Sequence, residues 1–327
     1  MEAFSEPCSC SQKRPGSNSS KVSQFDLGSE ATRLLNAANA VNTTSTYITG
    51  ISAFEKFRVL TQLSVTWPPP LDQLVNFIAY LSLNGYSDAT ARAYISAIGY
   101  KCKIEGLMDN TNRFIVAKLL QGFKRFRNRV DGRLPLTEHM LAQLIRVLTS
   151  ICHNKYEAIL FSSAYTLTFF AFLRVGELTL SKGNNSEVIL GIQDVKIKDK
   201  NLQVVLRHSK TDQFNKGVTI VLNSHAGITC PVHCMIDYMQ IRPKISGPLY
   251  CHFDGKQITR YQFSAVMGKA LAVLGYNSKL YTTHSFRIGA ATAAAEKGLS
   301  DEEIKLAGRW KSSAFQTYIR SPLTCSK

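Results

Sequence analysis

An alanine-rich stretch without proline constrains the fold of this chain most directly. It runs from His284 to Glu296, directly after Thr283, and it predicts a helix with that threonine as its N-cap. His284 and Arg287 stand three residues apart in this helix, which places their side chains on one face, about 5–6 Å apart at Cβ. An imidazole and a guanidinium in that position can bind one phosphate group together. Taken alone, the pair is equally compatible with a helix-terminal histidine and a surface arginine.

The next stretch predicts two further short helical segments. Ser300 and Glu303 have the spacing of a capping box, so a helix is expected to begin there and to end near Gly308. Tyr318 follows on a third short amphipathic piece. This tyrosine is either a core aromatic residue or, beside a phosphate-binding pair, a nucleophile.

A second charged pair stands further upstream. A very apolar helix is expected to start at about Tyr156, and Arg174 and Glu177 stand three residues apart at its end. Because a buried arginine without a partner is unfavourable, Arg174 is expected either to pair with Glu177 or to bind an anion while Glu177 orients it. Downstream, the stretch NLQVVLRHSKTDQFNKGVTIVL alternates like two strands around a polar loop, which predicts a hairpin. Lys210 lies where the first strand ends, and Lys216 is a second candidate lysine in the same loop.

Together these residues resemble the tyrosine recombinase, or phage integrase, superfamily. The match consists of Arg174 in an L-R-x-G-E box, Lys210 in the hairpin, His284 and Arg287 in H-x-x-R, and Tyr318 near the end of the chain. The phrases DGRLP, LRVGE, SKTDQ, THSFR and GRWKSSAFQTYIR are most similar to the recombinases of eukaryotic mobile elements of the DIRS, Ngaro and Crypton kinds. The resemblance covers about residues 30–322.

The resemblance implies a specific chemistry. Tyr318 would attack a DNA phosphodiester, forming a 3′-phosphotyrosyl bond and releasing a 5′-hydroxyl. Arg174 and Arg287 would stabilise the charge on the phosphorane, because guanidinium groups are planar and permanently charged. Lys210 would protonate the leaving oxygen, and His284 would assist proton transfer at the nucleophile. Neither ATP nor a metal ion is expected as a cofactor, and the sequence contains no P-loop motif.

One position departs from the family pattern. The family places a histidine or tryptophan nine residues before the nucleophile, and that position here is Arg309, with Trp310 one residue nearer. Trp310 is expected to fill the site, because its indole N–H can donate a hydrogen bond and its ring can exclude water. The alternatives are that Arg309 supplies a third cation or that Trp310 only packs the last helix.

The resemblance also implies a fold, which is mainly α with a small antiparallel sheet. A helical core-binding (SAM-like) domain is expected to precede an integrase-type catalytic domain that begins near Leu134, with Thr137 capping its first helix. The sheet is expected from residues 188–197, 202–207 and 218–222. The expected organisation is a disordered Ser-rich arm at 1–28, the helical domain at 29–127, a basic linker at 128–133, the catalytic domain at 134–322 and a tail at 323–327.

The helical domain is expected to contain helices at about 31–40, 45–63, after Pro70, 87–105 and 111–127. Two groups of its residues are candidates for DNA binding. The helix at 87–105 mixes small residues with groups able to lie in a groove, and the linker region is dense in arginine. The alternatives are an ordinary amphipathic helix with a partly buried tyrosine, and a solvated charge run. The candidates are Thr90, Arg92, Tyr94, Lys101, Lys124, Arg125, Arg127 and Arg129.

Charge favours a polyanionic partner. The chain carries 39 Lys and Arg against 23 Asp and Glu, a net charge of +16, which suits double-stranded DNA but also fits other basic proteins. Strand exchange in the family uses four protomers, so a tetramer is expected on synapsed DNA and a monomer or dimer in its absence. No apolar run approaches the roughly 20 residues of a membrane span, and no signal peptide is visible. An intracellular, nuclear location is expected.

The cysteine pattern offers one competing reading. The eight cysteines form no disulfide framework, and reduced thiols are expected. The cluster Cys230, His233, Cys234, Cys251 and His252 could bind zinc, but its spacing is not that of a standard finger. Core cysteines at the start of a helix, with Pro231 in its first turn, are the favoured interpretation.

Two functions from different classes remain open at this stage. The first is an active recombinase that cleaves and rejoins DNA, with a type IB topoisomerase as a nearby variant of the same chemistry. The second is a domesticated or inactive relative that only binds DNA. The first is favoured because all five principal positions carry competent groups.

Overall fold

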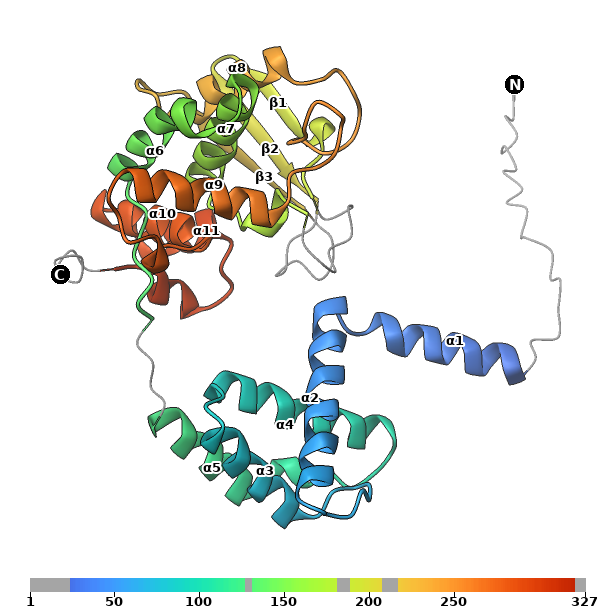
Figure 1. The fold of residues 1–327 in the computed structure, drawn as a ribbon. Coiled ribbons are helices and arrows are strands. Elements are labelled where there is room, and N and C mark those ends of the chain that lie inside the picture. The colour runs from blue at the N-terminus through green and yellow to red at the C-terminus, as the bar shows by residue number, and fades with distance from the viewer. Residues whose placement is uncertain (1–23, 127–130, 181–188, 208–216, 321–327) are drawn as a thin grey trace, which may run out of the picture. The chain divides into compact units, whose positions relative to one another are not determined.

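The computed structural model describes residues 24–126, 131–180, 189–207 and 217–320 (Figure 1). The chain divides into two compact units, Met1–Asn128 and Arg129–Lys327, called the N-terminal and C-terminal units below.

The described part of the N-terminal unit is helical. Helix α2 packs against α4, and α3 packs against α5 (Figure 1). Helix α2 ends at Leu60, and Gln62 then adopts a left-handed backbone with φ of 55°. Helix α3 begins directly after Pro70, and the side chain of Ser87 accepts a hydrogen bond from the backbone N–H of Thr90 to cap α4. The elements are α1 (Gln24–Ala37), α2 (Val41–Leu60), α3 (Leu71–Leu83), α4 (Asp88–Ile104), η1 (Asn110–Asn112, a 3-10 helix) and α5 (Phe114–Phe126).

The core of this unit combines phenylalanine rings with aliphatic side chains. Phe54 and Phe77 are fully buried with their ring centroids 5.0 Å apart, and Phe57 packs on both. Arg58 is also fully buried, with its guanidinium 4.5 Å from the centre of the Phe54 ring and 5.2 Å from that of Trp67. Aromatic faces stabilise this buried cation, which donates a hydrogen bond to the Thr66 carbonyl.

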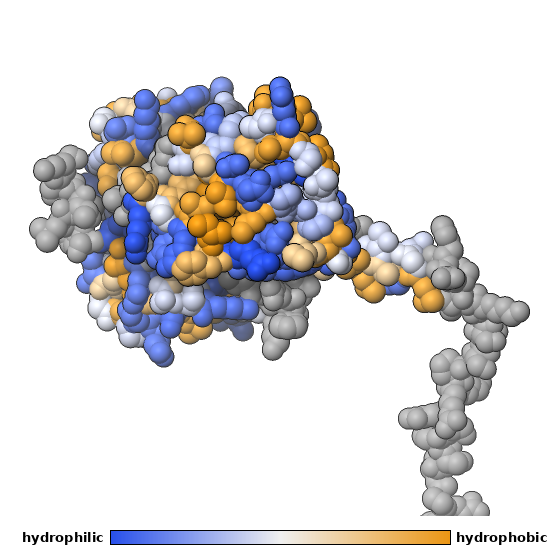
Figure 2. All heavy atoms as spheres, turned by 90° about the horizontal axis from the view of Figure 1, so that it is seen from below, coloured by the Kyte–Doolittle hydropathy of each residue, from blue (hydrophilic) through white to orange (hydrophobic). Residues whose placement is uncertain are grey.

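Helix α1 differs from its expected position. It begins at Gln24, whereas the sequence placed the helix start near Ala31 and assigned residues up to Gly28 to the disordered arm. Residues 1–23 lie outside the described part of the chain. The leucines of α1 are exposed, including Leu27 and Leu34, and Figure 2 shows apolar side chains along this helix.

The C-terminal unit combines helices with one small sheet (Figure 1). Its helices are α6 (Glu138–Ile151), α7 (Lys155–Phe170), α8 (Pro231–Ile241), α9 (Arg260–Val273), α10 (Ser285–Glu296) and α11 (Asp301–Gly308), and its strands are β1 (Val195–Lys198), β2 (Asn201–Leu206) and β3 (Val218–Asn223). The described residues of this unit also form the 3-10 helices η2 (Val175–Glu177), η4 (Ile192–Asp194), η5 (Ser278–Leu280) and η6 (Ser313–Tyr318). The Thr137 side chain caps α6, as predicted, by accepting from the Met140 N–H.

The sheet is antiparallel with strand order β1-β2-β3. The alternate residues Leu202, Val204 and Leu206 of β2 are buried, so one face of the central strand lies on the core. The first strand is shorter than the predicted 188–197, because η4 precedes β1 and occupies part of that range. Apart from this boundary, the predicted fold class is confirmed: a mainly helical protein with a small antiparallel sheet.

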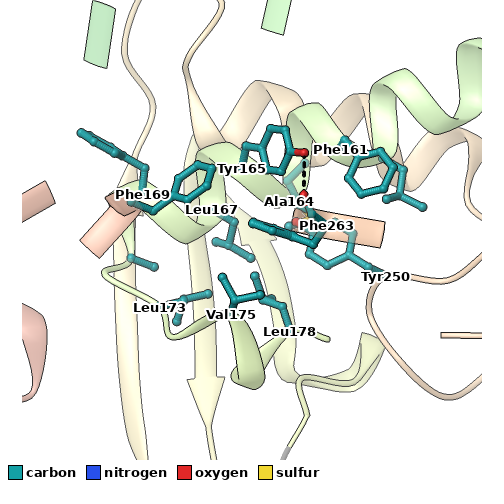
Figure 3. Packing of buried hydrophobic residues seen from close by; sticks show 14 of the residues in the cluster. Phe161, Ala164, Tyr165, Leu167, Phe169, Leu173, Val175, Leu178, Tyr250 and Phe263 are labelled. Carbon is teal, nitrogen blue, oxygen red and sulfur yellow. Dashed lines mark hydrogen bonds between the residues drawn. The ribbon is translucent and has the colours of Figure 1, made fainter. Parts of the chain in front are cut away.

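Helix α7 forms the centre of the core in this unit. Its residues Phe161 and Tyr165 are fully buried, and the Tyr165 hydroxyl donates a hydrogen bond of 3.0 Å to the Phe263 carbonyl (Figure 3). Cys230, Cys234 and Cys251 are buried as well, and α8 begins at Pro231 as predicted. Across the described ranges, the structure brings no three potential metal-binding side chains together. No helix within these ranges is long and apolar enough to cross a membrane.

Candidate active site

The Arg174–Glu177 pair lies on a turn rather than on a helix. Helix α7 ends at Phe170, and Phe172 adopts a left-handed backbone with φ of 50°, which turns the chain away from the helix axis. The expectation that the pair stands at the end of the helix itself is therefore wrong. Glu177 accepts a hydrogen bond of 2.9 Å from the Arg174 backbone N–H, and its other carboxylate oxygen lies 3.3 Å from Arg174 Nη1. Glu177 is buried, while the Arg174 side chain keeps 24% exposure.

Arg309 also forms an ion pair with the Glu177 carboxylate. Its Nη2 lies 2.9 Å from Glu177 Oε2, and its guanidinium also donates to the carbonyl groups of Ala171 and Phe172 at 3.2 Å. Arg309 caps the C-terminus of α11 with a left-handed φ of 56°. This geometry directs its side chain into the protein, where it joins α11 to the turn after α7. The Glu177 carboxylate therefore forms ion pairs with two guanidinium groups, those of Arg174 and Arg309.

Arg287 is the third cation of the site. It projects from α10, is only 1% exposed, and donates hydrogen bonds to the carbonyl groups of Phe172 and Gly308. Its guanidinium lies 4.3 Å from the centre of the Trp310 ring, and its Nε has no hydrogen-bond partner. Burial, followed by the positive charges of Arg174 and Arg309, lowers the pKa of Arg287 to about 9. Positive charge thus exceeds negative charge around Arg287, and an anion bound there would be stabilised.

His284 lies at the N-terminus of the same helix. It occupies the N-cap position of α10, so the expectation that Thr283 is the N-cap is wrong. The half-buried imidazole has a lowered pKa, caused first by burial and then by the charges of Arg133, Arg287, Arg260 and Arg174. At neutral pH the ring is therefore unprotonated and able to accept a proton.

Tyr318 ends η6 and lies beside these groups. The centre of its ring is 5.1 Å from that of Trp310, 5.8 Å from that of His284, and 5.9 Å from Arg287 Cζ. Its backbone is held on α10, because Thr292 Oγ1 donates to the Tyr318 carbonyl at 3.4 Å and accepts from the Arg320 N–H at 3.0 Å. The phenol therefore reaches the cations within a single chain.

Most of the predicted constellation is thus assembled in the C-terminal unit. Trp310, and not Arg309, faces Tyr318 and Arg287, whereas Arg309 is in the buried ion pair with Glu177. Lys210 and Lys216 lie outside the described residues. The described strands pair Leu206 of β2 with Val218 of β3, so the loop that carries both lysines joins these two residues.

Two further cations beside His284 were absent from the predicted site. Arg260, the first residue of α9, donates a hydrogen bond of 3.1 Å from Nη2 to Thr283 Oγ1. Arg133 had been assigned only to the basic linker. No local sequence pattern marks Arg260. Arg133 stands in the DGRLP phrase, but its position beside the site depends on contacts between distant segments.

The candidate DNA-binding residues of α4 are partly engaged within the unit. The Thr90 hydroxyl lies 2.8 Å from that of Ser87, and the Tyr94 ring packs 6.5 Å from Phe77. Lys101 forms an ion pair with the Glu105 carboxylate.

Arg92 is exposed and donates a hydrogen bond of 3.1 Å to the Leu120 carbonyl. Lys124 and Arg125 are exposed in the last turn of α5. Arg127 and Arg129 lie outside the described residues. Arg92, Lys124 and Arg125 are therefore the exposed members of the candidate set within the described residues, and their contact with DNA stays a prediction.

The fold of this chain is that of the tyrosine recombinases whose structures have been solved. It is similar to the XerH site-specific recombinase bound to a palindromic difH substrate in a post-cleavage complex, with 14% sequence identity, a TM-score of 0.62, and coverage of 84% of this chain and 75% of that chain. It is also similar to the Tn1549 transposon integrase in complex with transposon right end DNA, with 13% identity, a TM-score of 0.62, and coverage of 90% and 94%. A lambda integrase dimer bound to a COC′ core site gives 15% identity, a TM-score of 0.58, and coverage of 91% and 77%. No family model and no curated protein matches the sequence. At these identities, the likeness establishes a common fold.

Gly308 is required for the position of the indole. A Cβ atom on Gly308 would lie 1.6 Å from Trp310 Cζ3 and 2.0 Å from Cε3, so any larger residue must displace the ring. The indole in turn covers the Arg287 guanidinium. Gly308 therefore lets Trp310 fold back over Arg287.

We expect Gly308→Ala to displace Trp310 and to lower the free energy of unfolding by about 1–3 kcal/mol through overpacking. The chain has two tryptophans, so a Trp67→Phe background leaves Trp310 as the only indole. In that background, the Trp310 emission maximum should move to longer wavelength. Gly268→Ala on α9 is the matched control, because a Cβ there meets no atom within 4 Å. Unchanged emission and stability in Gly308→Ala would contradict this role.

Proposed function

We propose that this chain is a DNA breaking-and-rejoining enzyme, a site-specific recombinase or integrase that acts through a covalent bond between Tyr318 and DNA. The observation that supports this function is the convergence of the Tyr318 phenol with Arg287, His284 and Trp310. Cations outnumber carboxylates at this point, as a site for a phosphodiester requires. The similarity to recombinases in complex with DNA supports the same proposal.

The proposed cleavage step is a transesterification. The Tyr318 oxygen attacks phosphorus, the new O–P bond forms, and the bond from phosphorus to the 5′-oxygen breaks. His284 takes the phenol proton, which its lowered pKa permits because the imidazole is neutral at pH 7. Lys210 protonates the leaving 5′-oxygen in this proposal. Rejoining is the reverse reaction, in which a 5′-hydroxyl attacks the phosphotyrosyl bond, so ATP is not consumed.

In this proposal, Arg174 and Arg287 stabilise the transition state. Arg287 is buried under Trp310, where its charge is poorly screened by water, and Arg174 is partly exposed and held by Glu177. These two guanidinium groups would give the largest stabilisation of the negative charge that develops on the phosphorane. In this proposal, Trp310 excludes water from the covalent intermediate.

The proposed substrate is double-stranded DNA. A net charge of +16 favours binding through phosphate contacts, so affinity should fall steeply as salt concentration rises. The proposal includes a tetramer on synapsed DNA, and a nuclear role in a eukaryotic mobile element rests on the motif phrases alone.

A pool of nicked duplexes with a randomised core provides a test that needs no known target. A nick next to the cleavage position releases a short fragment and traps the covalent intermediate. The protein is incubated with the pool in EDTA, adducts are retained on filters in SDS, and the bound DNA is sequenced. We expect adducts at a preferred sequence and a DNA-linked peptide that contains Tyr318.

The other functions give different results in the same assay. Binding without an adduct, across a range of salt concentrations, would support a DNA-binding relative without strand exchange. Adducts without sequence preference, together with relaxation of supercoiled plasmid, would indicate a type IB topoisomerase. Cleavage that requires magnesium would indicate a metal-dependent nuclease and would contradict the proposed chemistry.

A further inference from the structure

A second cluster of charges stands directly beside the candidate active site. Asp131 accepts hydrogen bonds from Arg133 Nε at 2.7 Å and Nη2 at 2.9 Å, and from Arg320 Nη2 at 2.8 Å. We call Arg133, Asp131 and Arg320 the linker triad. Arg320 follows Tyr318 by two residues, so the triad ties the segment that carries Tyr318 to the start of the C-terminal unit.

The backbone next to Arg133 is fixed against the entrance to α10. The Leu134 N–H donates to the Leu280 carbonyl at 2.9 Å, and the Leu136 N–H donates to the Ser285 carbonyl at 3.0 Å. Gly289 allows this close approach, because a Cβ there would lie 1.8 Å from the Leu136 carbonyl oxygen. Arg133 therefore extends from a segment that is bound to α10 at the residue after His284.

The charge of Arg133 acts on both candidate reactive groups, His284 and Tyr318. After burial, the charge of Arg133 is the largest cause of the lowered pKa of His284. The pKa of Arg133 is raised, first by its hydrogen bond to Asp131 and to a smaller extent by Tyr318. The hydrogen bond from Arg133 is the main reason that the pKa of Asp131 falls to about 2, so this carboxylate is ionised at neutral pH.

The triad has one negative charge for two positive charges. The Arg133 side chain is 39% exposed, so solvent reaches its guanidinium. Its partner, Asp131, also pairs with Arg320. A surface ion pair of this kind contributes little to stability. A guanidinium that is held by a carboxylate and exposed beside a phosphate site is well suited to bind a second anion bidentately.

We propose that Arg133 binds a DNA phosphate next to the one that Tyr318 attacks, and that Asp131 is the positioning residue that holds Arg133 and Arg320 for this contact. The inference rests on the proposed function and adds to it a phosphate-binding residue outside the predicted constellation. It also gives the DGR sequence a role at the reaction centre rather than only in a linker.

The test combines protein variants with neutral DNA phosphates. On a duplex whose cleavage site has been mapped by adduct sequencing, single-turnover cleavage is measured for wild type, Arg133→Gln and Asp131→Asn. Each phosphate that flanks the site is replaced in turn by a methylphosphonate, which removes its charge. Arg146→Gln on α6 is the matched control. Arg146 is exposed, and its replacement by glutamine also removes one positive charge from the C-terminal unit.

We expect Arg133→Gln to slow cleavage of normal DNA by about 10- to 100-fold, which is the usual effect of losing one charge-assisted hydrogen bond in the transition state. At one methylphosphonate position the wild-type enzyme should be slowed equally, and Arg133→Gln should cause no further loss. For Asp131→Asn, a methylphosphonate at that same position should no longer slow cleavage. Arg133→Lys should cleave normal DNA faster than Arg133→Gln, because it keeps the positive charge. Arg146→Gln should keep wild-type sensitivity at every position.

Two outcomes would overturn the inference. Arg133→Gln could cleave at the wild-type rate, or its defect could be the same at every methylphosphonate position, as expected for a purely structural role. Neither result affects the proposed function, because wild-type adducts at Tyr318 would still form. Absence of adducts with the wild-type protein would instead remove both proposals.

Discussion

Replacing Tyr318 with phenylalanine is expected to abolish the covalent protein–DNA adduct and leave DNA affinity near the wild-type value. The substitution removes only the hydroxyl oxygen that would bond to phosphorus. The ring contacts with Trp310 and His284 and the backbone hydrogen bonds to Thr292 do not involve that oxygen. Loss of a nucleophile lowers turnover by about 10⁴-fold or more. Adducts on a labelled nicked duplex are measured in SDS gels, and affinity is measured by filter binding.

Tyr261→Phe is the control for this substitution. Tyr261 lies on α9 with 81% exposure, and loss of its hydroxyl should leave adduct formation unchanged. Adducts that persist in Tyr318→Phe would mean that another group attacks DNA, and peptide mapping would identify it. A parallel loss of DNA affinity would instead show that Tyr318 binds the substrate.

Local signals in the sequence predicted several of the helix boundaries in the C-terminal unit, whereas α9 (Arg260–Val273) was not predicted. Thr137 and Ser300 cap helices as expected, because a hydroxyl that satisfies a free backbone N–H acts within a few residues. The N-cap of α10 was misplaced because His284 makes no side-chain capping bond that a pattern could show. The end of α7 was misplaced because a phenylalanine, Phe172, takes the left-handed backbone that glycine usually marks.

The sequence did not determine which of Arg309 and Trp310 faces Tyr318 and which of them is buried elsewhere. These adjacent residues go to different places because the left-handed backbone at Arg309 turns the chain between them. Arg309 then meets Glu177, which is 132 residues away in the sequence, and Arg287 donates to Phe172, which is 115 residues away. Motif spacing predicted the residue types in the pocket, whereas only the tertiary fold determines which cation is buried.

Arg174 and Arg309 both pair with Glu177, but only Arg174 keeps a partly exposed side chain, and this difference leads to the second prediction. Arg174→Ala is expected to lower the rate of DNA cleavage by about 10²–10³-fold, the usual effect of removing one group that stabilises transition-state charge. The free energy of unfolding should change by no more than about 1 kcal/mol, because the Arg174 side chain is partly exposed and Glu177 retains Arg309 at 2.9 Å. Single-turnover cleavage and urea unfolding measure the two quantities, and filter binding should show nearly unchanged DNA affinity.

Arg309→Ala supplies the matched comparison, because it removes the other partner of the same carboxylate. Its side chain is 5% exposed and also supports the carbonyl groups of Ala171 and Phe172, so unfolding should become easier by about 3–5 kcal/mol. The two variants should therefore separate, with the larger kinetic defect in Arg174→Ala and the larger loss of stability in Arg309→Ala. A reversed order would make Arg309 the phosphate-binding cation and Arg174 its support. Equal losses of DNA binding and cleavage in Arg174→Ala would instead assign that arginine to substrate binding.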